Sequence, residues 1–207
     1  RATILVINGA ECEPYLTADH RLMLERGAEI VAGINILCRA LEVEKAYIGI
    51  ENNKPDAIAR MRKLTAGKPH IRVVPLRTRY PQGGEKQLID AVLGRQVPPG
   101  ALPIETGAVV QNVGTALAVY EAVQKNKPLF ERVVTVTGKG LPEPKNLLVR
   151  IGTPVSALLE QCGGIPATTT KIIAGGPMMG RAIANLEGAV IQKGSSGLVV
   201  MEGAEGL

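Results

Sequence analysis

Acidic side chains that could bind a polar ligand follow the first apolar run of this sequence. Glu11 and Glu13 flank Cys12, shortly after the run A-T-I-L-V-I at residues 2–7. Residues two apart in an extended chain point the same way, so we expect the two carboxylates to lie together, with Cys12 opposite. They could accept hydrogen bonds from a cofactor or substrate. Alternatively, they could be an acidic pair that stabilises the start of the next helix.

Two further turns contain residues suited to ligand binding. The turn Y-P-Q-G-G-E-K places Gly83 and Gly84 immediately before a predicted helix. Glycine lets the backbone approach a ligand closely, and a helix N-terminus offers N–H groups to anions. The turn Q-N-V-G-T joins a predicted strand to a helix, and Asn112 and Thr115 could either bind a ligand or cap that helix.

The elements that must position these turns alternate between strand and helix. Strands are predicted at residues 2–7, 45–50, 71–76 and 107–110, each followed by a helical pattern. This order favours an α/β fold with a mostly parallel sheet covered on both faces. Ligands bind such sheets beyond the carboxyl ends of the strands, where all three turns lie. We therefore predict one ligand site at this edge.

The pattern changes near residue 128, where short β-branched strands replace the alternation. The strands predicted there are residues 132–137, 146–151, 171–174, 189–192 and 197–201, with one short helix among them. This order is typical of a small β-grasp module. We predict two domains, residues 1–128 and 129–207. The stretch G-G-P-M-M-G in the second is more typical of a turn than of a dinucleotide-binding loop.

Composition narrows the class of protein. The 207 residues are 45% hydrophobic and 21% charged, which argues against disorder. The net charge of +5 is scattered, and the absence of Trp argues against a base-stacking surface for nucleic acid. The three cysteines are too dispersed to suggest an iron–sulfur or zinc site. No apolar run approaches the roughly 20 residues of a membrane helix. Because the chain starts inside a strand-like run, we expect a piece of a longer protein.

Five segments, taken together and in order, resemble the RnfC family, which belongs to the Rnf ion-translocating electron-transport complex. They are N-G-A-E-C-E-P-Y-L-T-A-D-H-R-L-M, Y-I-G-I-E-N-N-K-P-D-A-I, Y-P-Q-G-G-E-K-Q-L-I, V-V-Q-N-V-G-T-A and I-I-A-G-G-P-M-M-G. More distantly, the chain is similar to the NADH-oxidising flavoprotein subunit of respiratory complex I. The resemblance implies a Rossmann-like domain for FMN and NADH, followed by a soluble-ligand-binding β-grasp (SLBB) domain.

The resemblance also implies which residues line the flavin and nicotinamide. They are Asn8, Glu11, Glu13, Tyr80, Gly83, Gly84, Glu85, Asn112, Val113 and Thr115. Three positions depart from the complex I pattern: Ala10 stands for Asp, Lys86 for Glu and Gly114 for Glu. No side chain of this chain is implied as catalytic or as a metal ligand. The protein would orient the reactants, and the flavin would perform the hydride chemistry.

The implied activity is that of an NAD-linked oxidoreductase subunit, which passes electrons between NADH and iron–sulfur clusters through FMN. The implied partners are the other Rnf subunits, and the implied location is peripheral, on the cytoplasmic face of the cell membrane. Two [4Fe–4S] clusters and the loop for the FMN phosphate would lie outside this chain. We therefore expect the fragment alone to bind no cofactor and to be inactive. A cobalamin-reductase relative and a cofactor-free docking scaffold remain alternatives.

Overall fold

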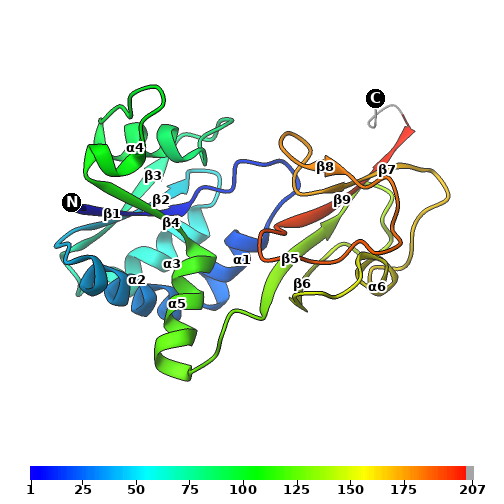
Figure 1. Cartoon of the computed structure of the whole chain (residues 1–207), viewed down its shortest axis with the longest axis horizontal. Coiled ribbons are helices and arrows are strands. Elements are labelled where there is room, and N and C mark those ends of the chain that lie inside the picture. Colours follow the sequence, from blue (N-terminus) through cyan, green and yellow to red (C-terminus); the bar gives the residue numbers. More distant parts are fainter. Residues whose placement is uncertain (204–207) are drawn as a thin grey trace. The chain divides into compact units, whose positions relative to one another are not determined.

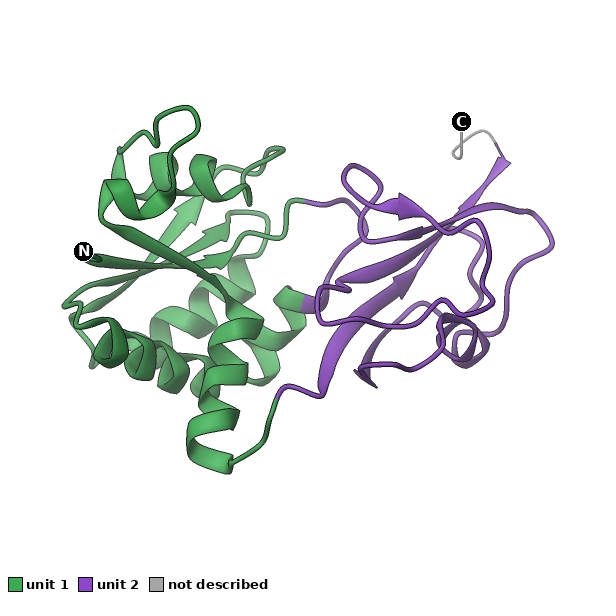
Figure 2. Cartoon of the chain, viewed as in Figure 1, with its two compact units in different colours: residues 1–12, 19–128 green, residues 13–18, 129–207 purple. Residues whose placement is uncertain are grey.

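The computed structural model describes residues 1–203, which form two compact units (Figures 1 and 2). The first contains residues 1–12 and 19–128, and the second contains residues 13–18 and those from 129 onward. The domains expected from the sequence were continuous, so residues 13–18 are placed differently. No helix among the described residues is long and apolar enough to cross a membrane.

The first unit is built on a parallel sheet of four strands in the order β3-β2-β1-β4. The strands are β1 (Ile4–Gly9), β2 (Ala46–Glu51), β3 (Ile71–Leu76) and β4 (Ala108–Asn112). The α-helices are α1 (Ala18–Glu25), α2 (Gly27–Leu41), α3 (Pro55–Thr65), α4 (Glu85–Leu93) and α5 (Val113–Lys125), with a 3-10 turn at Pro103–Thr106. The predicted α/β class is confirmed.

Helices cover both faces of this sheet (Figure 1). Leu5 and Ile7 of β1 belong to the core formed with α2, α3 and α5. Val6, between them, points to the other face and packs with Leu88 and Ile89 of α4. A strand buried on both faces must be apolar throughout, which explains the continuous run that opens the sequence.

The second unit contains a mixed sheet in the order β6-β5-β9-β7-β8. Its elements are β5 (Glu131–Thr137), β6 (Lys145–Arg150), α6 (Val155–Gln161), β7 (Thr169–Ala174), β8 (Arg181–Ala182) and β9 (Gly197–Glu202). β5 runs parallel to β9, and the other pairs are antiparallel. The strand predicted at residues 189–192 is wrong, because only an isolated bridge between Pro154 and Val190 forms there.

The two faces of the second sheet are covered by different parts of the chain. α6 packs on one face, where Leu158 and Leu159 join the main core of the unit. On the other, Leu16 is buried with Ile173 and Val199. Residues 13–18 therefore complete the core of the second unit, although they follow β1 in the sequence.

Candidate functional site

Asn8 ties two of the predicted turns together at the carboxyl edge of the first sheet. Its amide nitrogen Nδ2 donates to the carbonyl oxygen of Gly83 at 2.8 Å, and its Oδ1 accepts from the Ala10 N–H at 3.1 Å. Asn8 also lies beside Asn112 in the register of β1 and β4. The three turns thus meet at one edge of the sheet, and the hydrogen-bonding groups of the Asn8 amide position their backbones.

Gly83 allows the first two turns to approach each other. A Cβ at this position would lie 2.4 Å from the carbonyl oxygen of Ala10 and 3.2 Å from Cys12 Sγ. Gly84 follows as the N-cap residue of α4 in an extended conformation. The side chains on either side, Tyr80 and Glu85, are exposed to solvent. This turn therefore combines a close backbone contact with accessible side chains.

Asn112 caps a helix, as one of its two predicted roles required. Its Oδ1 accepts from the Gly114 N–H at 2.7 Å, at the start of α5. Its Nδ2 donates to Asp19 Oδ2, also at 2.7 Å. Val113 is buried in the core, whereas Thr115 is exposed. Of these side chains, Thr115 is the most accessible to a ligand.

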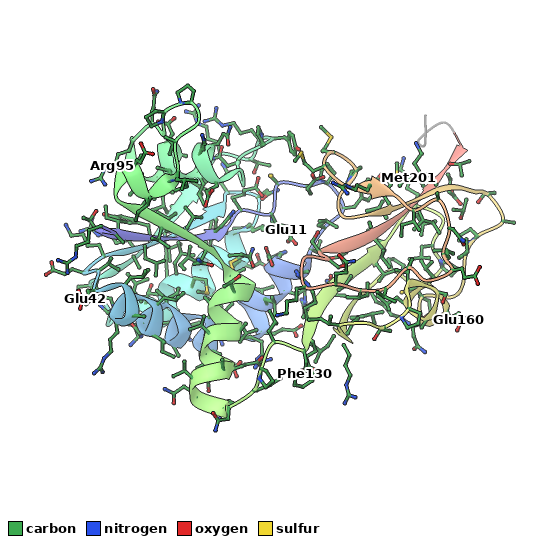
Figure 3. All side chains as sticks on the ribbon, viewed as in Figure 1. Glu11, Glu42, Arg95, Phe130, Glu160 and Met201 are labelled. Atoms are coloured by element: carbon green, nitrogen blue, oxygen red, sulfur yellow. The ribbon has the colours of Figure 1, made fainter. Side chains whose placement is uncertain are left out.

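Glu11 lies at the start of α1, as the helix alternative predicted (Figure 3). Its carboxylate accepts from the backbone N–H groups of Asp19 at 3.0 Å and His20 at 3.2 Å. Burial, reinforced by the charge of Asp19, raises the pKa of Glu11 from 4.5 to about 7, although these N–H groups and Lys54 oppose the rise. Glu11 can therefore hold or release a proton near neutral pH.

Glu13 does not share the environment of Glu11, so the expectation that the two carboxylates lie together is wrong. β1 ends at Gly9, and the chain enters the second unit at Glu13. There Glu13 Oε2 accepts from the Met178 N–H at 3.0 Å, while Oε1 is buried without a hydrogen-bond partner. The alternation typical of a strand does not extend past its end, which is why the spacing misled.

A buried ion pair at the same sheet edge was missed by the sequence reasoning. Glu51 ends β2, and its Oε2 lies 2.9 Å from Lys54 Nζ. Both residues are buried, at 1% and 7% exposure. The signal that could have revealed them is the one that singled out Glu11: a charged residue directly after a buried strand. No cluster of His, Cys, Asp or Glu within residues 1–203 is arranged to hold a metal ion.

Comparisons with known proteins agree with this architecture. Residues 1–121 match the Nuo51 FMN-binding domain, and residues 133–182 match the SLBB domain. The chain is 52% identical over 199 residues to the RnfC-type subunit of the proton-translocating ferredoxin:NAD(+) oxidoreductase complex of Clostridium ljungdahlii, covering 96% of this chain and 43% of that protein. It is 44% identical over 197 residues to the corresponding subunit of the Na(+)-translocating complex of Acetobacterium woodii, covering 95% and 44%.

A solved structure shows the same fold at low sequence identity. The NAD+-reducing [NiFe]-hydrogenase in the air-oxidized state aligns with a TM-score of 0.78 and 19% identity, over 97% of this chain and 40% of that one. The chain spans less than half the length of the curated relatives named above. The predicted resemblance to RnfC is confirmed, and the chain belongs to the Nuo51 FMN-binding domain family.

Proposed function

We propose that the full-length protein passes electrons between NADH and iron–sulfur clusters through FMN, as a peripheral subunit of an ion-translocating membrane complex. The observation that carries the proposal is the junction of three turns around Asn8, within the part of the chain that matches an FMN-binding domain. The relatives' names, which describe ferredoxin:NAD(+) oxidoreductase complexes, support the direction of the argument.

The groups at this edge fit the polar side of a flavin. Amide, carboxyl and backbone N–H groups gather there, and the start of α4 favours anions. The residues that would hold FMN and the nicotinamide are Asn8, Glu11, Tyr80, Gly83, Gly84, Glu85, Asn112, Val113 and Thr115. When bound, FMN would supply the hydride chemistry. Asn8 fixes the turns, and Glu11 holds a proton near neutral pH.

Glu13 takes a separate role in this proposal. The predicted site included it, but its contacts lie with the Met178 loop of the second unit. We propose that residues 1–128 serve as the FMN and NADH domain and residues 129–207 as the SLBB domain, with residues 13–18 anchored in the latter. The two [4Fe–4S] clusters would lie elsewhere in the full-length protein, so the fragment alone would be inactive. Its partners would be the other subunits, at the cytoplasmic membrane face.

A matched pair of variants in the full-length protein tests the proposal. Glu85 and Asp90 are both exposed carboxylates of α4, but only Glu85 lies in its first turn, at the predicted edge. Losing one charge-assisted hydrogen bond costs roughly 1.5–3 kcal/mol, so Glu85→Gln should lower kcat/KM for NADH about tenfold or more. Asp90→Asn should leave it unchanged.

The flavin content of the same preparation separates the alternatives. The proposal expects flavin absorbance and NADH-dependent reduction of ferricyanide. A full-length protein without flavin would favour the docking scaffold, and reduction of a corrinoid in place of an iron–sulfur acceptor would favour the cobalamin reductase. Equal effects of Glu85→Gln and Asp90→Asn would contradict the placement of the site at the start of α4.

A further inference from the structure

A buried ion pair lies beside the turn that carries Glu11. Glu51 and Lys54 are almost inaccessible to solvent, and their charged groups are 2.9 Å apart. Taking two charges out of water costs free energy that their attraction often fails to recover, so such a pair is weak evidence for stability. Its position at the carboxyl end of β2 suggests a role in the neighbouring site.

Lys54 connects this pair to the Glu11 turn. Its Nζ lies 3.5 Å from the carbonyl oxygen of Glu11, in addition to its contact with Glu51. The ammonium group therefore reaches the backbone of the turn, and its positive charge favours the ionised form of the nearby Glu11 carboxyl. Both effects come from one side chain whose conformation is fixed by burial.

The other groups around Glu11 come from α1 and its neighbours. Asp19 and His20 donate their backbone N–H groups to the Glu11 carboxylate. The side chain of Asp19 accepts from Asn112, and that of His20 contacts Asp56 of α3 at 2.8 Å. Asp19 opposes ionisation of Glu11, whereas Lys54 favours it. Lys54 is thus the cation that balances the acidic side chains of this cluster.

We propose that Glu51 and Lys54 are positioning residues, which hold the Glu11 turn in place and set the charge on Glu11 at the nucleotide edge. This inference rests on the proposed function for its purpose, but its mechanism concerns only residues of this chain. Glu51 orients the Lys54 ammonium group and partly neutralises it. Lys54 in turn determines how much positive charge the Glu11 carboxyl experiences.

Two substitutions should move Glu11 in opposite directions. Lys54→Met removes the cation, so Glu11 should stay protonated to higher pH. Glu51→Gln removes the competing carboxylate, so Lys54 should favour the Glu11 anion more strongly, and Glu11 should ionise at lower pH. A purely structural role would damage the site in the same direction in both variants. The sign of each change therefore distinguishes the two explanations.

The experiment is a ¹³C NMR pH titration of the full-length protein labelled at the glutamate carboxyl carbons. The Glu11 signal is assigned by its loss in Glu11→Gln. Lys54→Met should raise the titration midpoint of Glu11 by about one pH unit, as expected for the loss of a nearby opposite charge, and Glu51→Gln should lower it. Lys63→Met, which removes an exposed charge from α3, serves as the control and should leave the midpoint unchanged.

A double variant guards against misfolding, because Lys54→Met leaves the Glu51 carboxyl buried and unpaired. Combining Lys54→Met with Glu51→Gln removes both charges, and the Glu11 midpoint should still rise. An unchanged midpoint in Lys54→Met and in the double variant, or shifts of equal sign in the two single variants, would overturn the inference. The pH profile of NADH oxidation is recorded in parallel. If the midpoint moves as expected while a flavin-free protein shows no NADH oxidation, the positioning role stands and the proposed function fails.

Discussion

Glu11 and Glu13 are separated by one residue, yet they belong to different units and are held in different ways. Glu11 accepts two backbone N–H groups at the start of α1 and lies near the Lys54 cation. Glu13 accepts one N–H, from Met178, and its other carboxylate oxygen is buried without a partner. The first carboxylate is surrounded by groups that recognise its charge, whereas the second is mainly enclosed.

This difference indicates how each glutamate is used. A carboxylate with several donors and a nearby cation can change its protonation without leaving its place, which suits a ligand edge. A carboxylate with an unsatisfied buried oxygen carries a cost of about 1–3 kcal/mol, which suits a tether more than a ligand contact. We therefore predict that changes near Glu11 and near Glu13 affect different properties of the protein.

The largest effect is expected at the glycine that packs against the Glu11 turn. In Gly83→Ala, the new Cβ would lie 2.4 Å from the backbone oxygen of Ala10, which cannot swing aside. We expect a loss of about 2–3 kcal/mol in the free energy of unfolding, measured by urea denaturation. Gly67→Ala is the control, because no atom lies within 4 Å of its Cβ. Equal stability of the two variants would show that the turns are not packed as described.

Protonation of Glu11 should make stability depend on pH. The folded-state pKa of about 7 exceeds the ordinary 4.5, so the folded chain keeps a proton that the unfolded chain releases. This contribution is therefore present below pH 4.5 and is lost as the pH rises to about 7. Allowing for partial screening of the half-buried carboxyl, we expect a decline of about 2 kcal/mol across this window. Glu11→Gln should abolish the decline, and parallel curves for the two proteins would contradict the assignment.

A smaller effect is expected at the loop that holds Glu13. In Gly176→Ala, the Cβ would lie 2.2 Å from Glu13 Oε2 and 2.6 Å from Glu13 Cβ. Because a glutamate side chain can move, we expect a loss of about 1 kcal/mol. Faster hydrogen exchange at the Met178 amide should accompany it. Gly194→Ala, with no atom within 4 Å of its Cβ, should change neither quantity. Protection of Met178 equal to that in the wild type would argue against the tether.

The smallest effect is expected for Glu13→Gln. The amide oxygen can still accept from Met178, and removing a poorly satisfied buried charge offsets the weaker hydrogen bond, so we expect a change below about 1 kcal/mol. Thermal melts of the chain measure this. In the full-length protein, NADH oxidation should remain within about twofold of wild type. A much larger loss of activity without a change in melting temperature would restore Glu13 to the nicotinamide site.

Local patterns determined most of the first unit. The apolar runs predicted strands at nearly their observed positions, and the helices at residues 85–93 and 113–125 coincide with α4 and α5. The rule that parallel strands place their carboxyl ends at one edge correctly brought Asn8, Gly83 and Asn112 together. These inferences succeed because burial periodicity and strand-end geometry are properties of short segments.

The tertiary structure alone decided which contacts form across long stretches of sequence. Nothing within residues 13–18 shows that Leu16 packs with Ile173 and Val199, because that contact depends on how the second sheet folds. The pairing of Lys54 with Glu51 likewise requires the turn after β2 to bury both charges, whereas their sequence is equally compatible with an exposed loop. The sequence by itself thus determined the strands, helices and turns of the site. Only the folded chain decided the partners of Glu11, Glu13 and Lys54, because hydrogen bonding and burial depend on residues that are distant in sequence.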